Sequence, residues 1–314
     1  MCLPMPSDEY PTSLTQPFAT RPAGVVNAAR PSAAAATAPV RHWPAALHVH
    51  AYRDGQTTRL RHRHHGPLRL FKTLYPEGPS VAHAVVVHPP GGVCEGDTLD
   101  IDVEVAPGAH LMVTTPGATR FYRCEQAAAK QCTTLRVHPG ARLEWLPLEG
   151  LAYPGTLATN ALTLHVAEDA ELLAWDVLCL GLPAAGVSFE RGCFTQRWHW
   201  PGVWREYGVL DAEDTLLLHS PLGLGGHAAL GTLVYACGTP LSAPQRESLL
   251  EQVRAALPWG DVRAAATSPD ARLLLVRASA PLVEPLMQTL QSAWAALREA
   301  AWGMTAAPPR AWRL

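Results

Sequence analysis

Apolar and polar residues alternate over long stretches in the first three quarters of the chain. Between residues 99 and 105, for example, four aliphatic residues are separated by three acidic ones. This two-residue period is typical of a strand with one buried face. Pro-Gly steps, which favour tight turns, separate such stretches. The pattern predicts a mainly β body over residues 45–238.

One short pattern occurs three times in this region, over residues 103–111, 135–143 and 164–172. Each copy is an alternating strand, a tight turn of Pro-Gly or Glu-Asp, and a second strand that opens with Ala-x-Leu. A unit of this size cannot bury its apolar face alone, whereas stacked copies share a continuous core. The repeats predict a stacked, β-helix-like body, either a solenoid or a layered sandwich, and we favour the solenoid.

Helical spacing replaces alternation from about residue 239. One helix is predicted after Ser242 and Pro244, and it ends before Pro258. A short apolar strand, 273–276, follows. A second helix is expected to end at Gly303, because residues spaced by three or four positions form one apolar face: Val283, Leu286, Leu290, Trp294 and Leu297. We predict a single domain over residues 45–314, with a two-helix C-terminal part over 239–314 packed on the β body.

Residues 1–44 are rich in Pro, Ala, Ser and Thr and carry no large apolar residues at a regular period. Such a segment is predicted to be a flexible tail. Its start has neither the basic region nor the apolar run of a signal peptide. No stretch approaches the roughly 18 apolar residues that a membrane span needs, so we expect no membrane partner.

Charge and cysteine usage narrow the function classes further. The 25 basic and 27 acidic residues nearly cancel and form no basic stripe, so nucleic acid is not expected as a partner. The seven cysteines are irregularly spaced without a CxxC pair, which argues against a zinc ribbon or a thioredoxin-like motif. Reduced thiols in a cytoplasmic protein are the expectation.

Three histidines, His62, His64 and His65, lie in one basic segment. In an extended chain His62 and His64 point to the same side and could offer two imidazoles to one metal ion. The alternative is a surface strand with polar side chains.

The glycine-rich segment 88–97 follows an apolar strand pattern and contains His88, Cys94 and Asp97 as candidate ligands. The alternative use of Asp97 is to accept N–H groups of its own loop, and we favour that use.

Two further segments contain candidate residues. Arg120 or Arg123, on either side of Tyr122, could bind a partner's carboxylate, or the segment could simply be a turn followed by a strand. Glu144 and Trp145 must point to opposite faces of a strand, so one of them faces inward, and a buried carboxylate needs a specific partner.

The sequence gives little support for catalysis by a nucleophilic serine or for nucleotide binding. Ser188 lacks the second glycine of a GxSxG elbow. The glycines at 223–226 imitate a dinucleotide loop but precede a strand pattern rather than a helix, and there is no P-loop.

Several segments, in this order, resemble the UreD (also called UreH) family of urease accessory proteins. They are Arg63–Arg69, Leu74–Gly78, His88–Gly92 with Gly96 and Asp97, Thr114–Thr119 with Phe121 and Tyr122, Leu143–Pro147 with Glu149, and Pro309–Arg313. The resemblance spans about residue 45 to the C-terminus. The chain departs from the family pattern at Glu95, usually a small residue, at Leu148, often Gln, and at Leu182 and Val187, usually a charged Arg and Glu.

The resemblance implies a mostly β stack that carries two helices. It also implies a scaffold, not an enzyme, that binds the urease apoprotein and a UreF-type protein, which recruits the nickel-carrying GTPase UreG. The assembly delivers nickel to the urease active site, where a bridging lysine must be carbamylated. No cofactor would be stably bound, but nickel could pass transiently. Weak, successive ligands would suit such transit, and the candidates are His88, Asp97, Glu144 and Glu149.

Two other functions are compatible with parts of the sequence. A metal-dependent hydrolase on a β-helical fold would use His62, His64 and Asp97 as ligands, but the sequence shows neither a firm third ligand nor a poised base. A carbohydrate-binding module would need an exposed aromatic row, whereas most of the ten tryptophans are scattered or lie in apolar segments.

Overall fold

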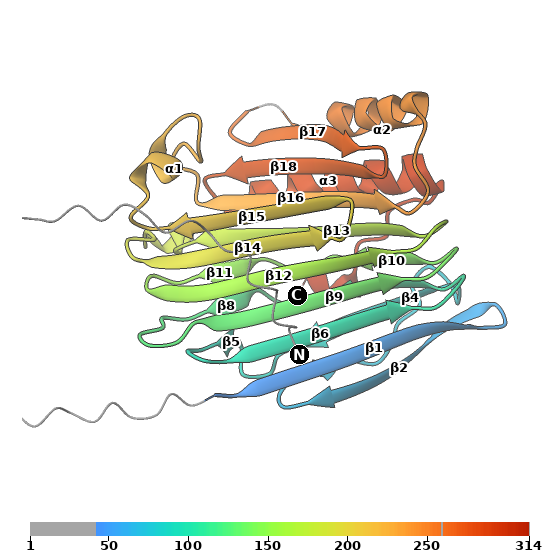
Figure 1. Cartoon of the computed structure of the whole chain (residues 1–314), viewed down its shortest axis with the longest axis horizontal. Coiled ribbons are helices and arrows are strands. Elements are labelled where there is room, and N and C mark those ends of the chain that lie inside the picture. The colour runs from blue at the N-terminus through green and yellow to red at the C-terminus, as the bar shows by residue number, and fades with distance from the viewer. Residues whose placement is uncertain (1–41, 259, 314) are drawn as a thin grey trace, which may run out of the picture.

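The computed structural model describes residues 42–258 and 260–313 (Figure 1). The tail predicted over residues 1–44 lies almost entirely outside the described residues.

The centre of the chain is a β-solenoid in which successive coils stack side by side (Figure 1). Each coil adds one strand to each of two large sheets, and strands of neighbouring coils pair in parallel. The first sheet receives β4 (Val81–Val87), β7 (His110–Thr114), β10 (Arg142–Trp145) and β13 (Glu171–Leu180). The second receives β6 (Thr98–Val105), β9 (Ala129–Val137), β12 (Thr156–Val166) and β14 (Gly192–Trp200). A short side is formed by β5 (Gly92–Val93), β8 (Thr119–Phe121) and β11 (Gly150–Ala152).

The three sequence repeats are the corners where one sheet passes into the other. Leu135 is paired with Val103 on one side and Leu164 on the other. The residue after each turn's Pro or Glu adopts a left-handed backbone, with φ of 69° at Gly108, 66° at Gly140 and 58° at Asp169. The solenoid predicted from the repeats is therefore confirmed.

Further strands extend both sheets. In the seven-stranded sheet, β1 (Pro44–Asp54) pairs in parallel with β6, β2 (Thr57–His65) forms one edge and β15 (Trp204–Asp211) forms the other. In the eleven-stranded sheet, β3 (Arg69–Leu70) lies at one edge. At the other end are β16 (Ala229–Cys237), β18 (Leu273–Ala280) and β17 (Arg263–Asp270). The apolar strand expected at 273–276 is confirmed within β18, while β17 was not predicted.

Both C-terminal helices are present. α2 (Ala243–Ala256) begins with a capping box between Ser242 and Gln245. α3 (Val283–Trp302) ends at Gly303, whose φ is 62°. Three short helices were not predicted: α1 (Thr215–His219), η1 (Pro183–Ala185) and η2 (Arg310–Arg313).

The apolar residues form two cores. One fills the solenoid between its two sheets, and the other lies between the outer face of the eleven-stranded sheet and the helices α2 and α3. Alternate residues of the same strand therefore enter different cores, as with Leu172 and Leu173 of β13. No helix within residues 42–258 and 260–313 is long and apolar enough to cross a membrane.

Candidate functional site

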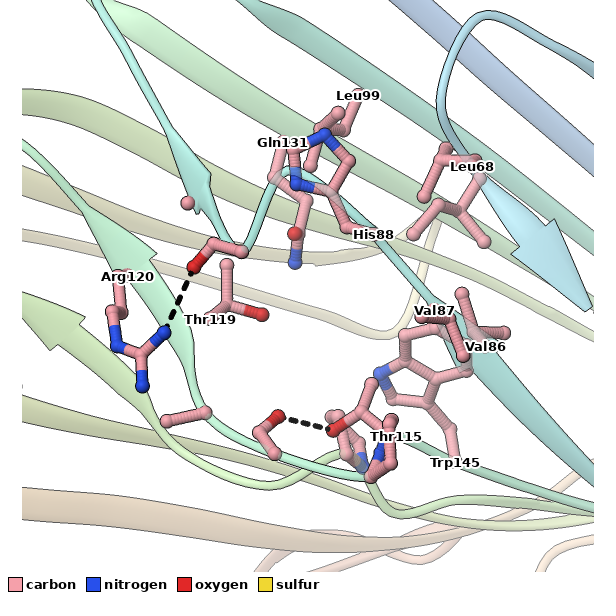
Figure 2. A pocket seen from close by; sticks show the side chains of 17 residues that line it. Leu68, Val86, Val87, His88, Leu99, Thr115, Thr119, Arg120, Gln131 and Trp145 are labelled. Atoms are coloured by element: carbon pink, nitrogen blue, oxygen red, sulfur yellow. Dashed lines mark hydrogen bonds between the residues drawn. The ribbon is translucent and has the colours of Figure 1, made fainter.

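A cavity of about 240 Å³ opens into the solenoid interior beside its short side (Figure 2). Its walls come from the end of β4, the loop before β8, and inward-facing residues of β6, β9 and β10. His88, Arg120 and Gln131 are among the lining residues. A smaller cavity adjoins it, because Thr119, Gln131 and Trp145 line both. The smaller cavity measures about 20 Å³, room for about one water molecule, and Asn160 and Asp176 of the following coils also line it.

Inward-facing amides lie in this part of the interior, one from each of three adjacent strands. Gln131, Asn160 and Gln196 occupy the same register position on β9, β12 and β14. Gln131 Nε2 donates to Asn160 Oδ1 at 3.3 Å. Asn160 Nδ2 and Gln196 Nε2 both donate to Asp176 Oδ2 at 3.0 Å, from the opposite sheet. We call these four residues the interior polar ladder.

Asp176 is the only carboxylate of this ladder, and its environment changes its acidity. The Asp176 carboxylate is surrounded by protein atoms, and only a small part of the residue is accessible to solvent. Burial raises the pKa of Asp176 to about 6, and the hydrogen bonds from Asn160 and Gln196 oppose that rise. A carboxyl group that titrates close to neutral pH can take up or release a proton, or hold a cation, under ordinary conditions.

His88 and Arg120, both predicted from the sequence, lie around the larger cavity (Figure 2). Burial lowers the pKa of His88, and the nearby Asp97 carboxylate acts in the opposite direction. The imidazole is therefore neutral at pH 7 and its nitrogen can bind a metal ion. Arg120 Nη1 donates to Gly91 O at 3.4 Å, which ties β8 to the glycine-rich loop.

The other candidates near this loop have packing contacts. Asp97 is buried, and its Oδ2 accepts the N–H of Cys94 at 2.8 Å, the loop-stabilising use that the sequence favours. Tyr122 packs edge-on against Tyr153 with ring centres 5.0 Å apart. Gly92 permits this, because a Cβ there would lie 2.1 Å from the Tyr122 ring. Glu149 is half-buried, and its charge adds to burial in raising the pKa of the Cys179 thiol to about 12.

His62, His64 and His65 lie on the exposed edge strand β2, apart from the cavity. His62 and His64 do share a side of the strand, and their rings stack with centres 6.3 Å apart. Arg69 Nη1 lies 3.0 Å from His64 Nδ1. Within the described ranges, no group of three His, Cys, Asp or Glu residues is placed to hold a metal ion.

Glu144 is fully buried, but it faces away from the cavity. Trp145 enters the solenoid core, so Glu144 points out of the first sheet, where α3 covers it. Its Oε2 accepts Trp294 Nε1 at 2.7 Å, and its Oε1 lies 2.9 Å from His110 Nε2. Arg298 Nε is 3.3 Å from Oε1, which is close enough for charge attraction, although its N–H is not aimed at that oxygen.

A second carboxylate completes this buried network. Glu77 accepts Arg298 Nη2 at 2.5 Å and lies 2.7 Å from His83 Nε2. Burial raises the pKa of Glu77, but the hydrogen bonds from His83 and Arg298 outweigh burial and leave the pKa below its usual value. Arg298, itself fully buried, therefore joins α3 to the loop before β4 and to β10. This network holds elements together and does not line the cavity.

The departures from the family pattern have structural explanations. Glu95 Oε1 accepts the backbone N–H groups of Glu125, Gln126 and Ala127, and these hydrogen bonds lower the pKa of Glu95. Leu182 and Val187 face each other in an isolated antiparallel bridge with N–H···O distances of 2.7 and 3.1 Å. Backbone bonds hold this turn where the family pattern has a charged pair. Leu148 packs against the core under the helices.

Sequence reasoning missed the residues of the interior polar ladder and most of the buried network. Asp176 gives a signal, because it is the only charged residue between Leu172 and Leu180 in an apolar strand. Arg298 gives another, since it continues the apolar stripe of Leu290 and Trp294 at intervals of four residues.

Comparison with known proteins gives a consistent answer. The family model described as UreD urease accessory protein matches residues 44–313. The chain is 48% identical over 272 residues to the urease accessory protein UreD of Variovorax paradoxus (strain S110), covering 86% of this chain and 99% of that protein. Identity is 48% over 274 residues with the protein of the same name from Paracidovorax citrulli (strain AAC00-1), covering 87% and 99%. Identity is 46% over 265 residues with the urease accessory protein UreD of Methylibium petroleiphilum, covering 80% of this chain and 90% of that protein. The resemblance identified from the motifs is thus confirmed, and the chain belongs to the UreD family of urease accessory proteins.

Proposed function

We propose that this chain is a urease maturation scaffold. It binds the urease apoprotein and UreF-type and UreG-type accessory proteins, and it supports insertion of nickel into the urease active site. Family membership supports the maturation role, and the accessory-protein names of the relatives support a role without catalytic turnover. The cytoplasmic location expected from the sequence is part of the proposal.

The interior polar ladder is the observation that carries the nickel part of this proposal. The imidazole of His88 lies at the cavity, and amide oxygens and one carboxylate follow along the interior. Imidazole nitrogen and amide or carboxylate oxygen are ligands for divalent nickel. The ladder side chains already form hydrogen bonds with one another, so each would bind the ion weakly, in exchange for such a bond, and pass it on. Nickel is here a cargo, not a resident cofactor.

This route differs from the one expected from the sequence. His88 stays on it, but Glu144 lies on the opposite face of β10 and Asp97 is engaged with its own loop. Asp176, with its pKa near 6, takes the place of the acidic group along the route.

Complementation of a urease operon that lacks its own UreD tests the maturation role. Urease activity and nickel per urease are measured together over time after nickel addition. We expect this chain to restore both, and failure of the soluble chain to restore either would overturn the proposed function.

The Asp176→Asn variant tests the interior route in the same assay. Removing the negative charge should slow nickel loading about tenfold or more, because a loss of about 1.4 kcal/mol already gives a factor of ten and a carboxylate–cation attraction inside a protein exceeds that. Asp54→Asn, on an exposed strand end, is the matched control and should load like the wild type. Equal loading by both variants would exclude the route but leave the scaffold role intact.

A further inference from the structure

An apolar groove of about 360 Å³ lies on the outer face of the eleven-stranded sheet, at the β3–β4 edge. Phe71, Leu74 and Tyr75 form one wall, and Pro116, Pro309 and Arg310 belong to the other. We call it the 71–76 groove. Its floor residues Met112 and His83 face away from the solenoid core, and Pro116 is the one lining residue that it shares with the solenoid cavity.

The first wall exposes an unusual amount of apolar surface. The exposed fractions are 54% for Phe71, 45% for Leu74 and 38% for Tyr75. Single exposed apolar residues are common on proteins, whereas contiguous ones beside a hollow mark binding surfaces.

Both walls are held in place by bonds that leave the groove open. Phe71 N donates to Val85 O at 2.9 Å, and Leu74 exchanges two backbone hydrogen bonds with His83 at 2.8 and 3.0 Å. Across the groove, Trp312 Nε1 donates to Thr114 Oγ1 at 2.8 Å, and its ring packs on Trp175. A preformed groove costs a partner little ordering free energy on binding.

Positive charge borders this groove. Arg310 lines the groove and is exposed, and it makes no ion pair with an acidic residue in the described part of the chain. Glu77, the carboxylate of the same segment as Leu74, is turned inward to His83 and Arg298. The described residues that line the groove therefore offer the Arg310 guanidinium, and no carboxylate, to whatever enters it.

Three of the segments that carry the family resemblance meet here, and two of them, Leu74–Gly78 and Pro309–Arg313, do not line the solenoid cavity. Leu74–Gly78 forms one wall, while Thr114–Thr119 and Pro309–Arg313 contribute to the other. Glu77 and Trp312 of these segments make internal hydrogen bonds, whereas the side chains of Leu74 and Tyr75 are exposed.

We propose that the 71–76 groove docks an acidic segment of a partner protein, which inserts an apolar side chain between the walls and places a carboxylate beside Arg310. Apolar insertion gives affinity, and the charge pair gives orientation and a faster encounter. This proposal rests on the proposed function, because the partner is one of the proteins of urease maturation.

The test measures binding of the full chain to the urease apoprotein and to the UreF-type protein encoded with it, each by biolayer interferometry. Leu74→Asp should weaken one of the two complexes about tenfold or more, as for a central interface residue. Arg310→Glu should slow association with the same partner and reduce its dependence on salt between about 50 and 300 mM, where surface charges become screened. Leu222→Asp is the control, since Leu222 is fully exposed and lies outside the groove. Thermal unfolding checks that all variants are folded.

Each outcome gives a decision. Selective weakening of one complex by both groove variants supports the proposal. Wild-type affinity of both variants for both partners overturns the groove and leaves the scaffold role standing. Absence of any complex with the wild-type chain overturns the proposed function and the groove with it. Binding to vesicles of anionic phospholipid that Leu74→Asp abolishes, with unchanged protein complexes, would replace the protein partner by a lipid surface and overturn the proposal.

Discussion

Asp176 is a candidate functional residue whose buried negative charge lowers the stability of the folded protein. Its pKa in the folded state is about 6, against 3.8 for an ordinary aspartate. The folded state therefore binds more protons than the unfolded state between about pH 4 and pH 6, and stability decreases as the pH rises through this window. Above pH 6 the buried negative charge remains a constant penalty.

Substituting Asp176 by Asn should remove this penalty, because the amide oxygen can still accept hydrogen bonds from Asn160 and Gln196. At pH 8 the free energy of unfolding should rise by about 2–3 kcal/mol, since one pKa unit corresponds to about 1.4 kcal/mol. At pH 4 wild type and variant should be nearly equal. Urea unfolding at both pH values measures this, and an identical difference at pH 4 and pH 8 would contradict the ionisation argument.

The same residue illustrates a trade-off. A variant that folds more stably and loads nickel more slowly would show that the carboxylate is retained for function at the expense of stability. A variant that loses both would point to a structural role for Asp176.

At the scale of elements, α3 depends on buried charge as well as on apolar packing. Arg298 contacts Glu77 and Glu144, whose side chains are largely or wholly buried. Removing the Arg298 cation leaves the carboxylates of Glu77 and Glu144 without their positive partner in a site with little water. The loss of stability is far larger than for an ion pair on the surface.

Arg298→Met keeps most of the side-chain volume and should lower the free energy of unfolding by about 3–5 kcal/mol. Denaturant unfolding with tryptophan fluorescence is suitable, because Trp294 and Trp175 lie with ring centres 6.4 Å apart in the same core. Arg59→Met, which breaks the exposed ion pair with Asp54, is the control and should change stability little. A small effect of Arg298→Met would mean that packing alone anchors α3.

The elements that could be predicted from the sequence are those encoded locally. The alternation of β6, the three corner repeats and the apolar stripe of α3 each lie within a short stretch of chain. The buried network could not be predicted, because its hydrogen bonds join residues up to 221 positions apart. The strand pattern indicates that Glu144 needs a specific partner if it is buried, but that partner, Trp294, is 150 positions away.

The candidate site shows the same division. His88 and Arg120 could be proposed from their motifs, and the structure places both at the cavity. The interior polar ladder arises only when three coils align in register, which no single segment reveals. His62 and His64 share a side of β2, as their spacing predicts, but their position on an edge strand follows from the sheet order.

At the scale of the whole molecule, β2 is the last strand of the seven-stranded sheet in the described part of the chain, and there only its start is bonded outward, by Thr58 N to Pro79 O at 2.9 Å. Unpaired backbone groups at such an edge can pair with another chain unless charged residues oppose it. The exposed end of β2 alternates arginine and histidine, with Arg61 and Arg63 among its residues. We interpret these cations as protection against edge-to-edge association.

Replacing Arg61 and Arg63 together by Val should therefore cause self-association. Sedimentation velocity over a concentration series should show a sedimentation coefficient that increases with concentration. Arg197→Val is the control, because Arg197 is exposed on β14, which has a strand on each side. A concentration-independent coefficient for the double variant would show that β2 needs no such protection.

The second core, between the eleven-stranded sheet and the C-terminal helices, can form only late in the synthesis of the chain on the ribosome. The solenoid strands that form the sheet side of this core are synthesised by residue 200, whereas α3 begins only at Val283. Until then the outward apolar residues of that sheet, such as Met112, Leu173 and Trp175, have no cover. A growing chain thus exposes an apolar face while residues 201–282 are synthesised. Its yield in cells should be governed by how quickly α3 is synthesised and docks, not by the stability of the folded protein.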